Sequence, residues 1–268
     1  MPSKSTPPPK QRSVVRGPGQ TPRTPFDAKA EGGPAPDVSI IIPVYNEEGL
    51  LQSSVVDLVD RMAAFDFTYE IVLSENGSFD DTLEQAYKLE RRFPQVRVMH
   101  SEVPDYGKAL RRGILSSHAT YVVCDEIDIC DTDFHKRALE ILFNDQADMV
   151  VGSKLHRDAQ DKRPPFRRFA SHVINFMLRV FLDFQGTDTH GLKAFHRERL
   201  LATVNQCVVD RDLFASEFVI RAERSRFRVL EIPVEIAEKR APSIKLMKRV
   251  PNVIKNLARL VWEIRIKP

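Results

Sequence analysis

The chain has 268 residues and a mass of 30.6 kDa, with 42% hydrophobic and 29% charged residues. These values fit a globular protein with a large core, and they exclude a small scaffold that needs disulfides to fold. Its three cysteines, Cys124, Cys130 and Cys207, lack a framework spacing, which favours a reducing cytosol over secretion. We predict neither a signal peptide nor a spanning helix, because the N-terminus is polar and no apolar run approaches ~18 residues.

The formal net charge of +3 conceals a division of the chain into three parts. Residues 1–36 carry a net charge of +4, residues 37–238 carry −9, and residues 239–268 carry +8. An acidic body therefore lies between two basic ends. This pattern points to an anionic membrane surface as a partner, and it argues against nucleic acid.

Residues 1–36 hold nine of the eighteen prolines and few apolar residues. Such a segment cannot bury enough surface to offset its ordering entropy, so we predict a disordered, basic tail. It would serve as a tether or simply as a solvated extension.

From residue 38 onward, β-branched apolar runs alternate with helical patterns. The expected strands are 38–42, 69–73, 96–100, 120–124 and 148–152, and the expected helices are 50–62, 79–92, 109–117 and 135–144. Short connections between them predict right-handed βαβ units and a parallel sheet.

After residue 153 the alternation changes. A basic loop over residues 154–168 precedes a helix at 169–181, a strand-like segment at 192–195, a helix at 213–225 and a strand at 228–233. We expect these elements to complete the same domain. The predicted fold class is a single α/β domain over residues 37–245, with a Rossmann-like, mostly parallel sheet flanked by helices.

The apolar residues of the C-terminal segment recur at steps of three and four, for example at Leu246, Val250, Leu257 and Ile264. This spacing predicts a basic amphipathic helix over residues 246–268. Such a helix is too short to span a bilayer. It either lies in an anionic membrane surface or docks on the domain by the same stripe, and both hold if the helix is exposed only at the membrane.

Ligands of open parallel sheets bind beyond the carboxyl ends of the strands. Polar loops follow three of the predicted strands there, at residues 43–48, 74–78 and 125–128. Glu126 and Asp128, two positions apart, can both point into one site and hold a hard divalent cation that keeps positions open for a diphosphate. The alternative is a solvated acidic loop or a cap on the following helix.

Short motifs follow one another between residues 38 and 245. They are VSIIIPVYNEE from Val38, ENGS from Glu75, GKAL from Gly107, EID from Glu126, VGSK from Val151, DTHGLKAF from Asp188, EIPV from Glu231 and RAPSIK from Arg240. In this order they resemble the motifs of family 2 inverting glycosyltransferases of GT-A fold. The similarity is greatest to the branch with dolichol-phosphate mannose synthase and polyprenyl-phosphate glucosyltransferases.

The resemblance implies a nucleotide-diphospho sugar as donor and Mg²⁺ or Mn²⁺ as cofactor. Glu126 and Asp128 would hold the metal against the diphosphate, and Asp128 and Arg240 would be catalytic. Metal and cations would neutralise the charge that develops on the departing nucleoside diphosphate. The residues implied to bind the donor are Pro43, Tyr45, Glu47, Glu75, Glu126, Lys193, Arg240 and Ser243.

The polyprenyl-phosphate branch implies a grip on the acceptor phosphate by Lys154, Arg167 and Ser171, although the basic loop has a second interpretation as an ordinary surface loop. An ionised phosphate oxygen attacks without a general base. A hydroxyl acceptor requires one, and the candidate is Asp188.

We therefore expect metal-dependent transfer of a hexose to a polyprenyl (dolichyl-type) phosphate by a peripheral protein at the cytoplasmic face of a membrane. One alternative is a family 2 enzyme that transfers to a saccharide or protein hydroxyl. The other is a catalytically weak nucleotide-sugar-binding or scaffold protein, suggested by Glu75-Asn76 and Glu126 in place of the aspartates usual in the family.

Overall fold

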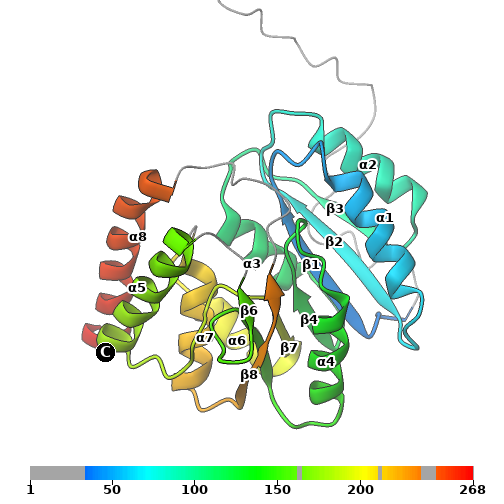
Figure 1. The fold of residues 1–268 in the computed structure, drawn as a ribbon. Helices are drawn as coiled ribbons and strands as arrows, with labels where there is room; N and C mark the ends of the chain where they lie inside the picture. The colour runs from blue at the N-terminus through cyan, green and yellow to red at the C-terminus, as the bar shows by residue number, and fades with distance from the viewer. Residues whose placement is uncertain (1–33, 162–164, 211–212, 237–245, 268) are drawn as a thin grey trace, which may run out of the picture. The chain divides into compact units, whose positions relative to one another are not determined.

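Strand β1 (Val38–Val44) is apolar on both faces, and all seven of its residues are buried at the centre of a sheet. The computed structural model describes residues 34–161, 165–210, 213–236 and 246–267 (Figure 1). In these residues a seven-stranded sheet has the order β3-β2-β1-β4-β7-β5-β8, and β6 and β9 form a separate parallel pair. The other strands are β2 (Tyr69–Glu75), β3 (Val96–Met99), β4 (Tyr121–Cys124), β5 (Met149–Ser153), β6 (Gln160–Asp161), β7 (Lys193–His196), β8 (Val229–Pro233) and β9 (Glu235–Ile236).

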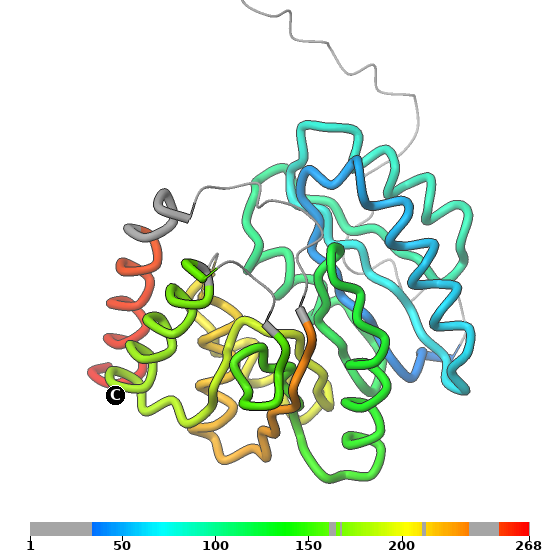
Figure 2. Tube along the Cα trace, viewed as in Figure 1, coloured from blue at the N-terminus to red at the C-terminus, as the bar shows by residue number. Residues whose placement is uncertain are grey.

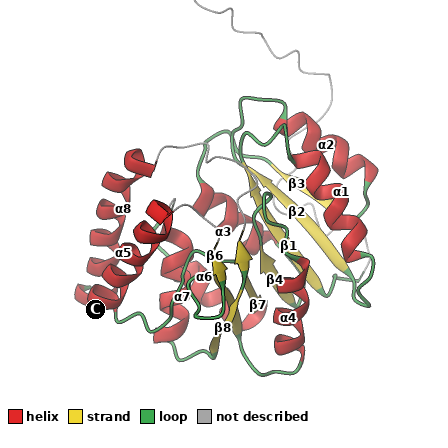
Figure 3. Ribbon diagram, viewed as in Figure 1, coloured by secondary structure: helices red, strands yellow, loops and turns green. Residues whose placement is uncertain are grey.

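Helices cover both faces of the large sheet (Figure 3). The side chains of β1 alternate between the two layers: Ile40 and Ile42 pack with α1, α2 and α4, whereas Ile41 packs with α3 and α7. This period of two is the pattern that a strand buried on both faces requires. The helices are α1 (Leu51–Met62), α2 (Thr82–Arg92), α3 (Tyr106–Ser116), α4 (Thr132–Phe143), α5 (Pro165–Leu182), α6 (Arg197–Gln206), α7 (Phe214–Arg224) and α8 (Leu246–Val261), which continues as a π-helical turn, Trp262–Ile266.

The direction of β7 matters most for the site. All other neighbours in the large sheet pair in parallel, but β7 runs antiparallel to both β4 and β5. The first residue of β7, Lys193, is therefore paired with the last residue of β4, Cys124. The reversal delivers a lysine to the edge of the sheet where the parallel strands end.

Two aspartates fix the starts of helices that lead away from this edge. Asp105 accepts a hydrogen bond from the backbone N of Lys108 at 3.0 Å, so α3 begins at Tyr106, before the predicted start at residue 109. Asp131 accepts one from the backbone N of Phe134 at 3.0 Å and caps α4. Asp131 is thus the residue of the acidic segment that caps α4, and the carboxylates of Glu126 and Asp128 are not needed as helix caps.

Helix α8 docks on the domain. Leu257 and Leu260 are buried in the same cluster as Leu178 of α5 and Phe214 of α7, and α8 lies beside α5 in the tube view (Figure 2). Part of the stripe stays outside, since Ile254 is 55% exposed. No helix in the described part of the chain has the length and apolarity needed to cross a membrane. Residues 1–33 of the predicted disordered tail lie outside the described residues.

Candidate active site

The site is built from four loops that meet at one edge of the sheet. Parallel strands β1, β2, β4 and β5 end there, and antiparallel β7 begins there. This is the edge at which the sequence places the functional loops.

The acidic loop after β4 is held by a buried carboxylate that sequence reasoning did not single out. Asp125 accepts hydrogen bonds from the backbone N of Glu126 at 2.7 Å and shares one with Nε2 of His135, on α4, at 2.6 Å. The Asp125 and His135 side chains are fully buried. Because one carboxylate joins the loop to α4, the backbone that carries Glu126 and Asp128 has a fixed position.

The pKa of the Glu126 carboxyl is raised by burial and by its position among other acidic side chains. Burial first, and then the charges of Asp128 and Asp125, raise the pKa of its carboxyl from 4.5 to about 7, against the opposing effect of Lys154 and Lys193. A carboxyl that burial and like charges keep partly protonated near pH 7 can exchange its proton for a metal cation.

The side-chain oxygens of the acidic loop fit a hard divalent metal that takes some of its ligands from a substrate. No group of three or more histidine, cysteine or acidic side chains in the described ranges could enclose a metal ion. Two neighbouring carboxylates, Glu126 and Asp128, supply oxygen ligands of the kind that Mg²⁺ and Mn²⁺ prefer, and a metal held by these two would take its remaining ligands from a substrate or water.

Lys193 faces the acidic loop from the start of β7. Its side chain is buried, and its Nζ donates to the carbonyl of Gly191 at 2.6 Å. Burial lowers the pKa of this ammonium to about 8, although Cys124, Asp188 and Glu126 favour its charged form. Lys193 therefore remains largely cationic at neutral pH, close to the acidic loop.

Lys154 and Asp188 form a buried ion pair. Lys154 Nζ lies 2.9 Å from Asp188 Oδ2, and the side chains are 9% and 2% exposed. Asp188 also accepts from the backbone N of His190 at 2.9 Å and of Lys154 at 3.3 Å. Burial alone would raise the pKa of Asp188, but the Lys154 ammonium and these N–H groups outweigh it, so the pKa is lowered. The structure thus pairs Lys154, which is predicted to bind the acceptor phosphate, with Asp188, which is the predicted base.

Hydrogen bonds to Glu231 of β8 hold the turn that carries Asp188. The Glu231 carboxylate accepts from the backbone N of Thr187 at 2.7 Å, from the Thr187 hydroxyl at 2.5 Å and from the backbone N of Asp188 at 3.2 Å. Gly191 closes the turn against β5: a Cβ at this position would lie 1.7 Å from the carbonyl oxygen of Gly152. The motifs beginning at Asp188 and Glu231 therefore make one structural unit.

The predicted nucleotide pocket lies at the ends of β1 and β2. Glu75 is fully buried, accepts from the backbone N of Ser78 at 2.6 Å and shares a hydrogen bond with Nδ1 of His100. Gly77 has φ +80°, and a Cβ there would meet the Glu102 carbonyl oxygen at 2.6 Å, so the turn requires glycine. Glu75 itself is the last residue of β2 and so lies at the edge of the sheet where the strand ends.

The other predicted donor residues lie on the same loop system. Pro43 is buried in β1 beside Ser74, and Tyr45 stands edge-on to Phe79 with ring centroids 6.1 Å apart. The backbone N of Glu47 donates to Thr82 Oγ1 at 2.7 Å, which ties this loop to α2. Pro43, Tyr45, Glu47 and Glu75 are thus placed around the ends of two adjacent strands.

Not every predicted residue can be placed. Arg240 and Ser243 lie outside the described residues, as does the side chain of Arg167. Ser171 is half-buried on α5, and Lys154 follows the last residue of β5. The site roles assigned to all these residues stay predictions.

One aromatic residue at the site was missed by the sequence reasoning. Tyr106, the first residue of α3, is 40% exposed, and partial burial together with the charges of Glu126, Asp125 and Asp128 raises the pKa of its phenol above its usual value of 10. Tyr106 therefore adjoins the acidic loop. Its position just before Gly107-Lys108, at a helix start after a strand, is the signal that could have found it.

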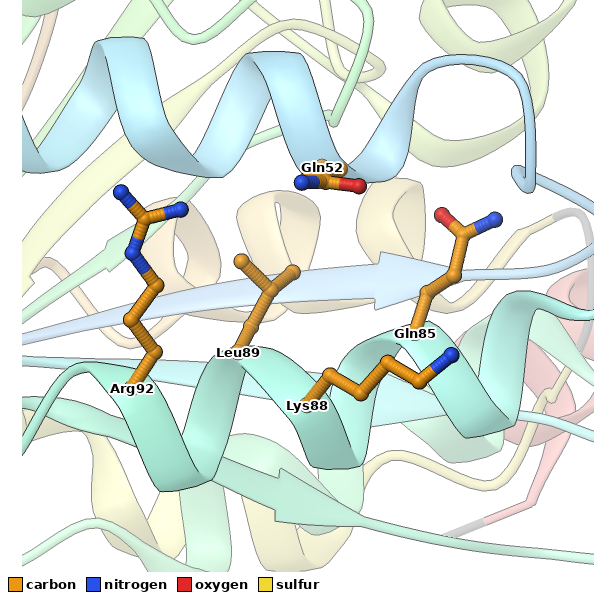
Figure 4. Close-up of a pocket in the computed structure, with 5 residues that line it drawn as sticks. All are labelled: Gln52, Gln85, Lys88, Leu89 and Arg92. Atoms are coloured by element: carbon orange, nitrogen blue, oxygen red, sulfur yellow. The ribbon is translucent and has the colours of Figure 1, made fainter.

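A small pocket between α1 and α2 is separate from this site. Its lining residues converge from the two helices, as Figure 4 shows, and they are Gln52, Gln85, Lys88, Leu89 and Arg92. None of them is a predicted site residue, so we assign the pocket no role in the chemistry.

Comparison with known proteins decides the family. The model of the glycosyl transferase family 2 domain matches residues 39–204. The chain belongs to this family. The predicted resemblance is confirmed, and the protein is a glycosyltransferase.

Similar proteins include a further glycosyltransferase and several dolichyl-phosphate beta-glucosyltransferases. Glycosyltransferase AglD of Haloferax volcanii is 28% identical over 92% of this chain, but the aligned region is 40% of AglD. Dolichyl-phosphate beta-glucosyltransferases of Drosophila melanogaster and Homo sapiens are 29% and 28% identical over 78% and 76% of this chain. The matches cover 69% and 68% of those two enzymes.

Solved structures show the same fold. Glucosyl-3-phosphoglycerate synthase from Mycobacterium tuberculosis, crystallised with Mn²⁺, UDP and phosphoglyceric acid, superposes with a TM-score of 0.60 at 18% identity. The superposition covers 92% of this chain and 84% of that one. The predicted GT-A fold is confirmed.

Proposed function

We propose that this glycosyltransferase moves glucose from a nucleotide-diphospho sugar to a polyprenyl (dolichyl-type) phosphate, with inversion and with the help of a divalent metal. The similarity to dolichyl-phosphate beta-glucosyltransferases over three quarters of the chain supports both the sugar and the acceptor. The basic residues around α5 and α8 support action at an anionic membrane surface. The cytoplasmic face of that membrane stays a prediction.

The ion pair of Lys154 and Asp188 is the observation that favours a phosphate over a hydroxyl as the acceptor. A hydroxyl acceptor needs a base whose pKa lies near the working pH. Asp188 is the candidate, but the Lys154 ammonium 2.9 Å away lowers the pKa of its carboxyl and so weakens it as a proton acceptor. A phosphate monoester, whose oxygens are ionised near neutral pH, needs no such base.

The reaction then requires positioning and charge stabilisation alone. A phosphate oxygen of the acceptor attacks the anomeric carbon as the bond from that carbon to the diphosphate oxygen breaks, and the nucleoside diphosphate leaves. Lys193, buried and close to Glu126, would stabilise the charge that develops on the departing diphosphate. Lys154, one of whose N–H groups faces Asp188, would orient the acceptor phosphate with its remaining donors.

Glu126 and Asp128 would hold the metal, and His135 and Asp125 would keep their loop in place. When bound, Mg²⁺ or Mn²⁺ supplies positive charge to the diphosphate leaving group. All other stabilisation of the leaving diphosphate would come from the protein's own cationic side chains and backbone N–H groups.

The acceptor is tested by comparing two lipids that differ only in the phosphate. The protein is incubated with radiolabelled UDP-glucose or GDP-glucose, Mn²⁺ and detergent-dispersed polyprenyl phosphate or polyprenol. We expect label in the organic phase with the phosphate alone. Equal labelling of the alcohol would favour a hydroxyl acceptor, and no labelling with either lipid would exclude the proposed acceptor.

A further inference from the structure

The turn after β2, residues 75–78, contains one acidic side chain, that of Glu75. Its neighbour Asn76 is neutral, and both ends of the buried Asn76 amide are in use. Nδ2 donates to the carbonyl of Val44 at 3.0 Å, and Oδ1 accepts from the backbone N of Asp105 at 2.9 Å. Asn76 thus joins the end of β1 to the start of α3, and Glu75 is the acid of the turn.

The carboxylate of Glu75 lies against the ring of His100, the residue that directly follows β3. Oε1 of Glu75 accepts from the backbone N of Ser78 at 2.6 Å, and Oε2 shares a hydrogen bond with Nδ1 of His100. The Glu75 side chain is fully buried, whereas the His100 side chain is 34% exposed. A ligand at this edge can therefore touch the imidazole but not the carboxylate.

This pairing determines which nitrogen of His100 carries a hydrogen. An ionised carboxylate only accepts hydrogen bonds, so Nδ1 must donate to it. Nε2 is the other polar atom of the ring, and it makes no hydrogen bond to the residues that the structure describes. A carboxylate behind an imidazole holds the ring in one orientation and directs the chemistry to Nε2.

The backbone of His100 is held as well. Arg112 of α3 donates from Nη1 to the carbonyl of His100 at 3.4 Å, and the backbone N of Ser101 donates to the carbonyl of Glu75 at 3.1 Å. Burial lowers the pKa of the Arg112 guanidinium, and the charge of Glu75 opposes this effect, so the cation lies close to the pair. Contacts from β2 and α3 thus fix His100 in the way that a recognition residue requires.

The strand order separates His100 from the acidic loop. Strand β3 is three places from β4 in the sheet, which is about 14 Å at about 4.8 Å per strand. A diphosphate held by a metal at Glu126 and Asp128 would not reach His100 over that distance, whereas the base at the other end of the nucleotide would extend toward it. Tyr45 and Glu75, both predicted to bind the donor, follow β1 and end β2, the two strands in between.

We propose that His100 binds the base of the donor nucleotide through Nε2, and that Glu75 is the positioning residue behind it. The inference rests on the proposed function in one respect, namely that the donor is a nucleoside diphosphate sugar. The role predicted for Glu75 then becomes indirect, because the carboxylate orients the ring and the ring meets the base.

The contact is tested with the full chain by calorimetry. The ligands are UDP and GDP, each with Mn²⁺, and inorganic pyrophosphate with Mn²⁺, which has the diphosphate but no base. The variants are His100→Phe, His100→Gln and Glu75→Gln, and the matched control is His118→Phe, at an exposed histidine after α3. Thermal unfolding shows whether each variant is folded. If His100→Phe is not, the double variant Glu75→Gln/His100→Phe replaces it, because it leaves no unpaired buried charge.

We expect His100→Phe to weaken the binding of whichever nucleoside diphosphate the wild type binds by at least ~10-fold, because a hydrogen bond to the base is lost. Its affinity for pyrophosphate should equal that of the wild type. His100→Gln, whose amide can take the place of Nε2, should recover part of the loss. Glu75→Gln should lose less than His100→Phe, and His118→Phe should lose nothing.

Four results would overturn the proposal. They are an unchanged nucleoside diphosphate affinity in His100→Phe, an equal loss of pyrophosphate affinity, a larger loss in Glu75→Gln than in His100→Phe, and a wild type that binds neither UDP nor GDP. The second would show a merely structural effect, and the third would show that Glu75 meets the base itself.

The lipid-linked transfer assay separates this inference from the proposed function. Base-dependent binding that requires His100, without any lipid-linked product, leaves the role of His100 intact and refutes the acceptor. Normal lipid-linked product from a chain whose His100→Phe variant binds the nucleoside diphosphate like the wild type refutes the role of His100 alone.

Discussion

The buried pair of Lys154 and Asp188 offers a quantitative test of the site's electrostatics. Replacing Lys154 by Met keeps most of the side-chain volume but leaves the Asp188 carboxylate, 2% exposed, without its ammonium. Removing one partner of a buried pair costs about 3–5 kcal/mol. We expect the lower end, about 3 kcal/mol, because the backbone N–H groups of Lys154 and His190 still donate to Asp188.

The double-mutant cycle isolates the interaction. Urea unfolding, followed by circular dichroism, is measured for Lys154→Met, Asp188→Asn and the double variant. The double variant should lose less stability than the two single variants together, by about 2 kcal/mol or more, because it leaves no unpaired charge. Additivity within about 0.5 kcal/mol, or a cost of Lys154→Met below about 1 kcal/mol, would refute the reasoning.

The pH dependence has a defined sign. In the wild type the folded pKa of Asp188 is below the unfolded value near 3.8, so the pair's contribution is complete above that value and is lost as pH falls through the folded pKa. In Lys154→Met, burial without the ammonium raises the folded pKa above 3.8. The stability gap between variant and wild type should therefore narrow as pH falls through that raised pKa toward 3.8, whereas a gap that stays constant down to that value contradicts the assignment.

Two further predictions concern the acidic loop. Because the pKa of Glu126 is raised to about 7, Mn²⁺ must displace a proton below that pH, and its affinity by calorimetry should fall about 10-fold per pH unit below 7. Glu126→Gln should bind Mn²⁺ weakly at every pH, and a wild-type affinity without pH dependence would exclude Glu126 as a ligand. His135→Phe removes the partner of Asp125 and should weaken Mn²⁺ binding about 10-fold, while His118→Phe, at an exposed histidine, should not. Equal affinities in both histidine variants would show that His135 does not position the loop.

The sequence predicts the parallel part of the fold well, because strands buried on both faces read as apolar runs such as Val38–Val44. It does not predict the reversal of β7, since the four residues Lys193–His196 carry no mark of direction. Helix α6, Arg197–Gln206, escapes notice because it follows β7 without a linker and has only three buried residues.

The site is predictable to the extent that it follows strand ends. Glu126 and Asp128 stand directly after β4, so the topology alone places them. The contacts between Lys154 and Asp188, and between Asp125 and His135, depend on how β5, β7 and α4 pack, and a linear sequence does not contain that geometry. For this reason the residues that tune the site were harder to find than those that compose it.

The most direct test of the proposed function is lipid-linked transfer by the wild type and by Asp128→Asn, with radiolabelled nucleotide-glucose, Mn²⁺ and polyprenyl phosphate. We predict label in the organic phase for the wild type and a loss of at least ~100-fold in rate for Asp128→Asn, because one of the two carboxylates proposed to hold the metal is removed. Thermal unfolding shows whether the variant is folded. An unchanged rate in Asp128→Asn would contradict the catalytic role of the acidic loop, and the absence of labelled lipid with the wild type would contradict the proposed function.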